Sequence, residues 1–320
     1  MQGAEQSRPD GKGRPMTPAP TPEPVRREEL GAAFRLLFQH ADPAEREART
    51  VNALRLVRRG ELDPHGLFVL CGRRGLLGAV FCLPMPGASA LVWPPQCVLS
   101  PRRDAMEDDL LRHAADWLRA RGVKVAQALL TADEARFADA LPRNGFAHVA
   151  ALWFLRHDLS AAQPPSSTPV RLDYRPYDPS NSTPFHQTLR HTYEGTLDCP
   201  ELNGARDVED VVAGHRPPGK FDHDLWSLAL ADGVPVGVLM LTEAPDTRDW
   251  EVSYVGVVPE VRRRGFGREL MLEALSKARA AGAPTLGLSV DGRNHPAWDL
   301  YLDLGFRPYD CREVFLAVWK

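Results

Sequence analysis

The feature that most constrains the fold is an internal repeat. The second half of the 320-residue chain aligns on the first without a gap when 160 is subtracted from its residue numbers. Residues shared at this shift are Arg102 and Arg262, Arg103 and Arg263, Leu110 and Leu270, Arg119 and Arg279, Gly145 and Gly305, and Phe146 and Phe306. A helix, a strand and a closing turn keep their register, so we predict two copies of one fold.

Apolar periodicity predicts strands alternating with helices in both halves. In the first half, helices are predicted within 26–59, at 106–121 and near 132–141, and strands at 67–71, 76–83, 91–99, 123–130 and near 149–157. In the second half, helices are predicted near 183–195 and at 268–281 and 296–304, and strands at 225–231, 236–241, 250–258, 285–290 and 314–319. We therefore predict two α/β domains, each a mixed, mostly antiparallel sheet flanked by helices.

Composition suggests where these domains begin and end. Residues 1–24 are polar and rich in proline, which predicts a disordered tail, and the proline- and serine-rich stretch 161–170 predicts a linker. The expected domains are residues 25–160 and 171–320.

Composition also limits the partners. A net charge of -3 gives no reason to expect binding to nucleic acid or to an anionic membrane. Five scattered cysteines without Cys-x-x-Cys spacing predict free thiols rather than disulfides or a metal site. No apolar run is long enough for a signal peptide or a membrane span, so we expect a cytoplasmic protein, either monomer or homodimer.

A glycine- and arginine-rich turn in the second half predicts an anion site. The segment 258–270 leads from a strand through an arginine triplet, Gly265 and Gly267 into a helix. Backbone N–H groups of such a turn and of the helix N-terminus converge on one point, and the glycines allow close approach of a pyrophosphate. The arginines add charge-assisted hydrogen bonds, whereas a triplet without a longer basic patch does not indicate nucleic acid.

The first half has lost this chemistry. At the equivalent positions it carries Asp104, Ala105, Glu107 and Asp108 in place of two arginines and two glycines, and Leu141 in place of Tyr301. Carboxylates repel a pyrophosphate. We expect the first half to keep the fold and to be catalytically silent.

Two motifs in the second half resemble those of the GNAT acyltransferases. Arg262-x-x-Gly265-x-Gly267 is similar to the acyl-CoA loop of that family, and Asn294-x-x-Ala297-x-x-Leu300-Tyr301-x-x-x-Gly305-Phe306 is similar to its closing pattern. The two-copy arrangement resembles that of the mycothiol synthases, in which the first copy is degenerate. The resemblance implies an N-acetyltransferase that moves an acetyl group from acetyl-CoA, without a metal, to a small-molecule primary amine. It also implies cofactor contacts by Val257, Val258, Arg263, Arg264, Gly265, Phe266, Gly267, Arg268 and Asn294.

The same resemblance assigns the proton transfers. Tyr301 is the expected general acid for the leaving thiolate, although a tyrosine that merely packs in the core would show the same spacing. Glu251 is the expected base, although an exposed glutamate is common at a strand start. Strand alternation predicts that four residues share a face, namely Glu251, Ser253, Val255 and Val257. Asn294 fits either a contact with the CoA arm or a local turn.

The acceptor is less well defined by the sequence. The segment 183–226 is expected to roof the acceptor site, and its acids, including Asp198 and Glu201, could hold a cationic amine or simply be polar loop residues. Cys199 is expected to be structural, and Arg293 either meets a phosphate or is solvated. Acetylation of a peptide and non-catalytic binding of acyl-CoA remain alternatives.

Overall fold

The computed structural model describes residues 20–160, 170–216, 221–244 and 247–319. The first half contains β1 (Glu23–Pro24), α1 (Leu30–Leu37), α2 (Pro43–Arg59), β2 (Leu67–Gly72), β3 (Gly75–Met85), β4 (Ser89–Cys97), α3 (Arg103–Arg119), β5 (Val125–Leu130), α4 (Ala132–Ala135), α5 (Ala140–Arg143) and β6 (Ala147–Asp158). The second half contains β7 (Asp173–Pro176), α6 (Thr183–Thr192), α7 (Val208–His215), β8 (Trp226–Ala231), β9 (Val234–Glu243), β10 (Trp250–Val257), α8 (Phe266–Ala280), β11 (Thr285–Asp291), α9 (His295–Asp303) and β12 (Arg307–Val318).

The repeat is visible as the same β–α–β unit in each half. In the first half, β4 pairs in parallel with β5 after the helix α3, and only over three residue pairs, 89–91 with 125–127. In the second half, β10 pairs with β11 after α8 over 250–252 and 286–288. Leu110 of α3 and Leu270 of α8 are both fully buried. Each unit therefore splits open beyond its short parallel ladder.

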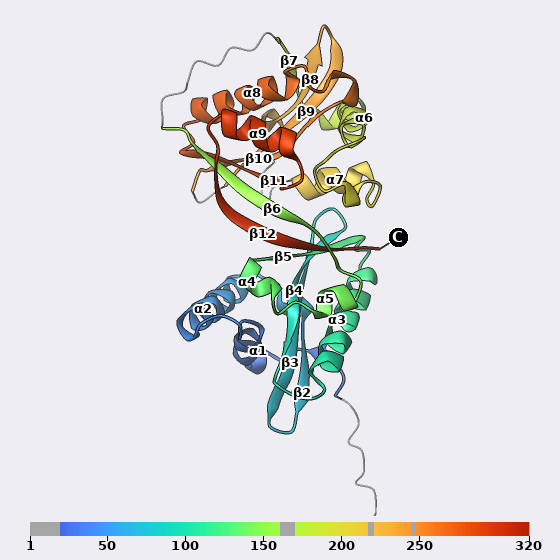
Figure 1. Cartoon of the computed structure of the whole chain (residues 1–320), viewed down its shortest axis with the longest axis vertical. Helices are drawn as coiled ribbons and strands as arrows, with labels where there is room; N and C mark the ends of the chain where they lie inside the picture. Colours follow the sequence, from blue (N-terminus) through green and yellow to red (C-terminus); the bar gives the residue numbers. More distant parts are fainter. Residues whose placement is uncertain (1–19, 161–169, 217–220, 245–246, 320) are drawn as a thin grey trace, which may run out of the picture.

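The described strands form one continuous sheet rather than two. Its order is β1-β2-β3-β4-β5-β12-β6-β11-β10-β9-β8-β7. The last strand of each half lies in the sheet of the other half: β12 pairs with β5, and β6 pairs with β11. Figure 1 shows β6 and β12 running side by side between the two halves. The predicted boundary near residue 160 therefore separates the halves along the chain but does not divide the sheet.

The exchanged strands also complete the apolar cores. Phe315 and Ala317 of β12 pack in the core of the first half, and Leu155 of β6 packs in the core of the second half. Each half thus obtains part of its core from the other, so we expect neither half to fold stably when cut at the linker.

Several predicted elements differ in detail from those observed. Residues 1–19 and 161–169 of the predicted tail and linker lie outside the described residues. The tail prediction is wrong for Glu23–Pro24, which pair with β2 as a short edge strand, a position where proline is tolerated. The helix predicted near 132–141 is two short helices, α4 and α5. The strand β7 and the helix α7 were not predicted.

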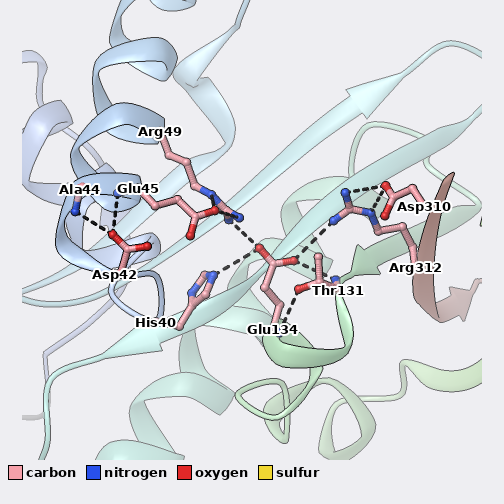
Figure 2. Close-up of polar contacts among 9 residues, drawn as sticks. All are labelled: His40, Asp42, Ala44, Glu45, Arg49, Thr131, Glu134, Asp310 and Arg312. Carbon is pink, nitrogen blue, oxygen red and sulfur yellow. Dashed lines mark hydrogen bonds and ion pairs between the residues drawn. The ribbon is translucent and has the colours of Figure 1, made fainter.

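A partly buried carboxylate, that of Glu134, links β12 to the first half. Oε1 of Glu134 accepts from Nη1 of Arg49 at 2.6 Å and lies 3.3 Å from Nε2 of His40. Its Oε2 accepts from the backbone N–H of Thr131 and lies 3.9 Å from Nη1 of Arg312 on β12. Figure 2 shows Glu134 between these groups. Burial alone would raise the pKa of Glu134, but the hydrogen bonds from His40 and Arg49 hold it well below its usual value.

Replacing Glu134 with alanine is expected to lower the free energy of unfolding by about 3 kcal/mol, because it removes the acceptor of a charge-assisted hydrogen bond from Arg49 and of the Thr131 N–H. The pKa of Glu134 is lower in the folded than in the unfolded state, so its stabilisation is complete above the unfolded pKa and fades as the pH falls below about 4. Urea unfolding at pH 7 and pH 3 measures both effects. Glu45→Ala is the matched control, since Glu45 also binds Arg49 but is largely exposed; an equal loss in both variants would contradict the assignment.

Candidate functional site

The split between β10 and β11 opens into a cavity of about 520 Å³. Its walls come from the end of α6 and the segment after it, from β10, from the turn before α8, and from α9. Predicted site residues that line it are Val257, Arg263, Gly265, Gly267, Arg268, Asn294 and Tyr301. Those that do not line it are Glu251, Val258, Arg264 and Phe266. The structure therefore brings the predicted loop and the predicted acid together, but not the predicted base.

The turn before α8 has the backbone shape of an anion site. Arg263 and Gly265 have positive φ angles of 63° and 90°, so the chain turns sharply and α8 begins at Phe266, two residues earlier than predicted. No side chain caps the N-terminus of α8. The first N–H groups of a helix have no partner within the helix, so these amides can bind an anion in the cavity.

Arg262 supports this turn rather than a ligand. Its guanidinium donates to three backbone carbonyls, those of Val257 at 3.0 Å, Gly195 at 3.0 Å and Thr192 at 2.9 Å. It thereby ties the end of β10 to the end of α6. The cavity-lining arginines left for a ligand are Arg263 and Arg268.

One ion pair occurs at equivalent positions of the two halves, but the positions of the acid and the arginine are exchanged. In the second half, Nη1 of Arg268 lies 3.9 Å from the carboxylate of Asp303. In the first half, the equivalent pair is reversed, with Nε of Arg143 3.0 Å from Asp108. Glu107, which replaces Gly267, is buried and binds Arg103 at 2.7 Å. Glu107 and Asp108 are therefore paired with arginines of the first half, and the buried Glu107 occupies the position at which Gly267 lines the cavity of the second half.

The end of β10 presents main-chain amides to the split. The N–H of Val258 donates to the carbonyl of Val236 at 3.0 Å, so it is not free to bind a ligand as predicted. Successive amides of an extended strand point to opposite edges, which turns the N–H of Val257 toward the split. There, β11 no longer pairs with β10.

A β-bulge changes the predicted faces of β10. Its register against β9 shifts between Val252 and Tyr254, and the extra residue reverses the alternation. As a result Val252 packs against the same core as Val255 and Val257, while Glu251 points to the other face. The prediction that Glu251 shares a face with Val255 and Val257 is therefore wrong.

Tyr301 combines a core position with access to the cavity. It is 7% exposed, its ring packs 6.0 Å from that of Phe306, and it lines the cavity wall. Burial, with a contribution from the charge of Asp198, raises the pKa of its phenol well above the usual value. Among the described residues, none forms a hydrogen bond with its hydroxyl. A protonated phenol is thus held at the cavity at neutral pH.

Glu251 is solvent-exposed, and its backbone lies between Thr242 of β9 and Gly287 of β11. Partial burial of the carboxyl group nevertheless raises its pKa. Its role as a base stays a prediction.

A network of acids and one arginine fixes the roof of the cavity. Asp198, which lines the cavity, accepts the N–H of Asp291 at 2.8 Å through Oδ1, and Asp291 accepts the N–H of Cys199 at 3.1 Å. Arg293 binds Asp291 at 2.6 Å and both carboxylate oxygens of Glu201, at 2.7 and 2.9 Å. The side chain of Arg293 is 43% exposed, in line with the predicted alternative of a solvated arginine, but its guanidinium is also paired with two carboxylates. It fastens the roof segment to the end of β11.

The roof also contains Asp198 and Cys199, and in both side chains burial raises the pKa. Burial raises the pKa of Asp198, and burial with the neighbouring acids raises the pKa of the Cys199 thiol to about 12, which keeps the thiol protonated. Asn294 caps α9, with its side-chain oxygen 3.4 Å from the N–H of Ala297, and at the same time lines the cavity.

No group of three or more potential metal ligands was found among the described residues. None of the described helices has the length and apolarity needed to cross a membrane.

Comparison with known proteins places this site in a family. Residues 192–306, which contain the cavity walls from the end of α6 to α9, match the model of the acetyltransferase (GNAT) family. The second half of the chain belongs to the GNAT family. The observed fold of both halves agrees with this assignment: the structure of a GCN5-related N-acetyltransferase from Sphaerobacter thermophilus superimposes with a TM-score of 0.56 at 18% identity, covering 93% of this chain and 95% of that one.

Curated relatives of this chain carry a more specific name. The mycothiol acetyltransferase of Thermomonospora curvata is 35% identical over 167 residues, which is 52% of this chain and 54% of the relative. The mycothiol acetyltransferase of Thermobispora bispora is 32% identical over 167 residues, which is 51% of this chain and 55% of that relative. The match thus spans about half the length of these relatives. A glucosamine N-acetyltransferase region of a fungal β-N-acetylglucosaminidase shares the fold, with a TM-score of 0.58 at 15% identity over 94% of this chain and 38% of that one.

Proposed function

We propose that the protein transfers the acetyl group of acetyl-CoA to a primary amine of a small molecule by direct attack of the amine on the thioester. The observation that carries this proposal is a single cavity that combines the uncapped N-terminus of α8, the split beside Val257 and the buried phenol of Tyr301. The pyrophosphate would bind the turn at Arg263 to Arg268, and the N–H of Val257 would bind the pantetheine arm or the thioester carbonyl.

Each proton in this reaction has a proposed carrier. The ammonium of the acceptor gives its proton to Glu251, acting through water because Glu251 does not line the cavity. The amine nitrogen then bonds to the thioester carbon, the carbon–sulfur bond breaks, and Tyr301 protonates the thiolate that leaves. The second proton of the amine nitrogen, which is lost as the amide forms, returns to the tyrosinate. Asp198, held in the roof by Asp291, supplies a carboxylate beside which a cationic acceptor can bind.

Binding and turnover test this proposal separately. Calorimetric titration with acetyl-CoA measures the first, and release of free thiol from acetyl-CoA in the presence of primary amines measures the second. The deacetylated form of mycothiol is the first amine to test, given the name of the relatives. Absence of acetyl-CoA binding would exclude the proposed function. Binding without turnover across small amines and peptides would instead indicate a non-catalytic acyl-CoA-binding module.

Replacing Glu251 with glutamine is expected to lower kcat/KM for the amine about 100-fold, because the ammonium loses its proton acceptor. A base acts only when ionised, and the pKa of Glu251 is raised, so the acidic limb of the wild-type pH profile should lie above the usual glutamate range and disappear in the variant. Glu243→Gln, at an exposed position on the adjacent strand β9, is the control. A Glu251→Gln variant with an unchanged acidic limb would assign the base elsewhere.

A further inference from the structure

A second cavity lies behind the roof of the first. It has a volume of about 250 Å³ and is formed by the end of α6, the segment 202–207 and the start of α7. Tyr193 lines this cavity and Tyr254 lines the first, and the centroids of their rings are 5.2 Å apart. The rings of Tyr193 and Tyr254 thus form part of the wall between the two cavities.

Two arginines line the second cavity without a carboxylate partner. Arg206 donates one hydrogen bond, from Nη1 to the carbonyl of Gly87 at 3.1 Å, which holds it against the β3–β4 hairpin of the first half. Its Nε is buried and has no hydrogen-bond partner in the structure. Arg190 of α6 is exposed. Within the described residues, neither guanidinium forms an ion pair with an acid. A guanidinium offers five N–H donors, so both retain most of their capacity.

The acids at this cavity do not neutralise these arginines. Asp207 binds Nζ of Lys124 at 2.9 Å and caps α7 by accepting the N–H of Asp210 at 2.8 Å. The side chain of Glu209 is 73% exposed and lies 3.9 Å from a ring nitrogen of His186. The cavity thus presents two available guanidiniums against one carboxylate that faces solvent.

The neighbouring histidine adds no positive charge at neutral pH. Burial, and then the charge of Arg206, lower the pKa of His215 to about 4. The ring of His215 packs 5.6 Å from that of Tyr254. The positive charge of the cavity therefore belongs to the arginines at any pH near neutral.

We propose that this second cavity binds an anionic group, a carboxylate or a phosphate, of a small molecule through Arg190 and Arg206. Planar guanidiniums match the geometry of both anions and bind them through paired hydrogen bonds. The anion has two possible sources. It is either a free small anion, or a part of the acceptor whose amine reaches the first cavity past the rings of Tyr193 and Tyr254. The second source rests on the proposed acetyl transfer.

Calorimetric titration of the full chain, saturated with coenzyme A and kept at constant ionic strength, tests the site. The probes are inorganic phosphate, glucosamine and glucosamine 6-phosphate. A phosphate-bearing probe is expected to bind at least about ten-fold more tightly than glucosamine. This advantage should be lost in Arg190→Met and in Arg206→Gln. Arg58→Met, an exposed arginine on α2, is the charge-matched control and should bind like the wild type.

The pattern of binding identifies the source of the anion. Binding of inorganic phosphate that depends on both arginines indicates a site for a free anion. An advantage limited to glucosamine 6-phosphate, again dependent on both arginines, indicates the acceptor's own group. Equal affinity for all probes, or an advantage that survives in Arg190→Met and Arg206→Gln, overturns the proposal. Because coenzyme A binding is measured first, failure of the proposed function appears in that step and is distinguishable from failure of the anion site.

Discussion

Replacing Gly267 with glutamate is expected to weaken acetyl-CoA binding at least about 100-fold, equivalent to about 2.7 kcal/mol, while the protein remains folded. Gly267 is the second residue of α8 and lines the cavity, and Glu107 stands at the equivalent position of the first half. A carboxylate there occupies the approach to the uncapped amides and repels a pyrophosphate. Calorimetric titration with acetyl-CoA measures the loss.

The fold should not suffer from this change. A Cβ at Gly267 would come no closer than 3.7 Å to its neighbours, and glycine is a poor helix former. A negative charge in the first turn is also favourable. The melting temperature should therefore stay the same or rise. Gly31→Glu is the matched control, because Gly31 also lies in the first turn of a helix, α1, where a Cβ would come no closer than 3.6 Å to its neighbours, and it is far from the cavity in sequence. Unchanged acetyl-CoA affinity in Gly267→Glu would mean that the cofactor binds elsewhere.

Replacing Tyr301 with phenylalanine is expected to lower kcat about 100-fold or more with little change in acetyl-CoA affinity. The ring fills its core position in both residues, so only the proton donor is removed. The raised pKa of the phenol keeps it protonated throughout the neutral range, so the wild-type rate should show no alkaline decline from this group near pH 8. Single-turnover acetyl transfer measured between pH 6 and pH 9 tests both statements.

Tyr309→Phe provides the comparison for this variant. Tyr309 lies on β12, is 56% exposed, and does not line the cavity. A Tyr301→Phe variant that retains wild-type kcat would reduce Tyr301 to a packing residue, the alternative that the sequence left open. A variant that instead lost acetyl-CoA affinity would indicate that the hydroxyl serves binding rather than proton transfer.

Some of the predicted site residues line the cavity and others do not, for a physical reason. Gly265, Gly267 and Tyr301 belong to local motifs, and local backbone preferences fix such motifs wherever the chain places them. Glu251 was placed by counting alternate residues along β10, and a single bulge at Ser253 moved it to the other face. Contacts that depend on distant segments, such as Arg262 with the carbonyls of α6, have no local signal.

The sequence by itself determined the repeat, the alternation of strands with helices in each half, and the turn before α8, because each depends on periodicity or on glycine at defined positions. Only the tertiary structure decided that β6 and β12 exchange places, that Arg293 fastens the roof and that Arg206 faces a second cavity. Strands with similar apolar alternation can pair with several partners, so their choice depends on which arrangement fills both cores at once. The role of a charged side chain likewise depends on folding, which either places a partner beside it or leaves it without one.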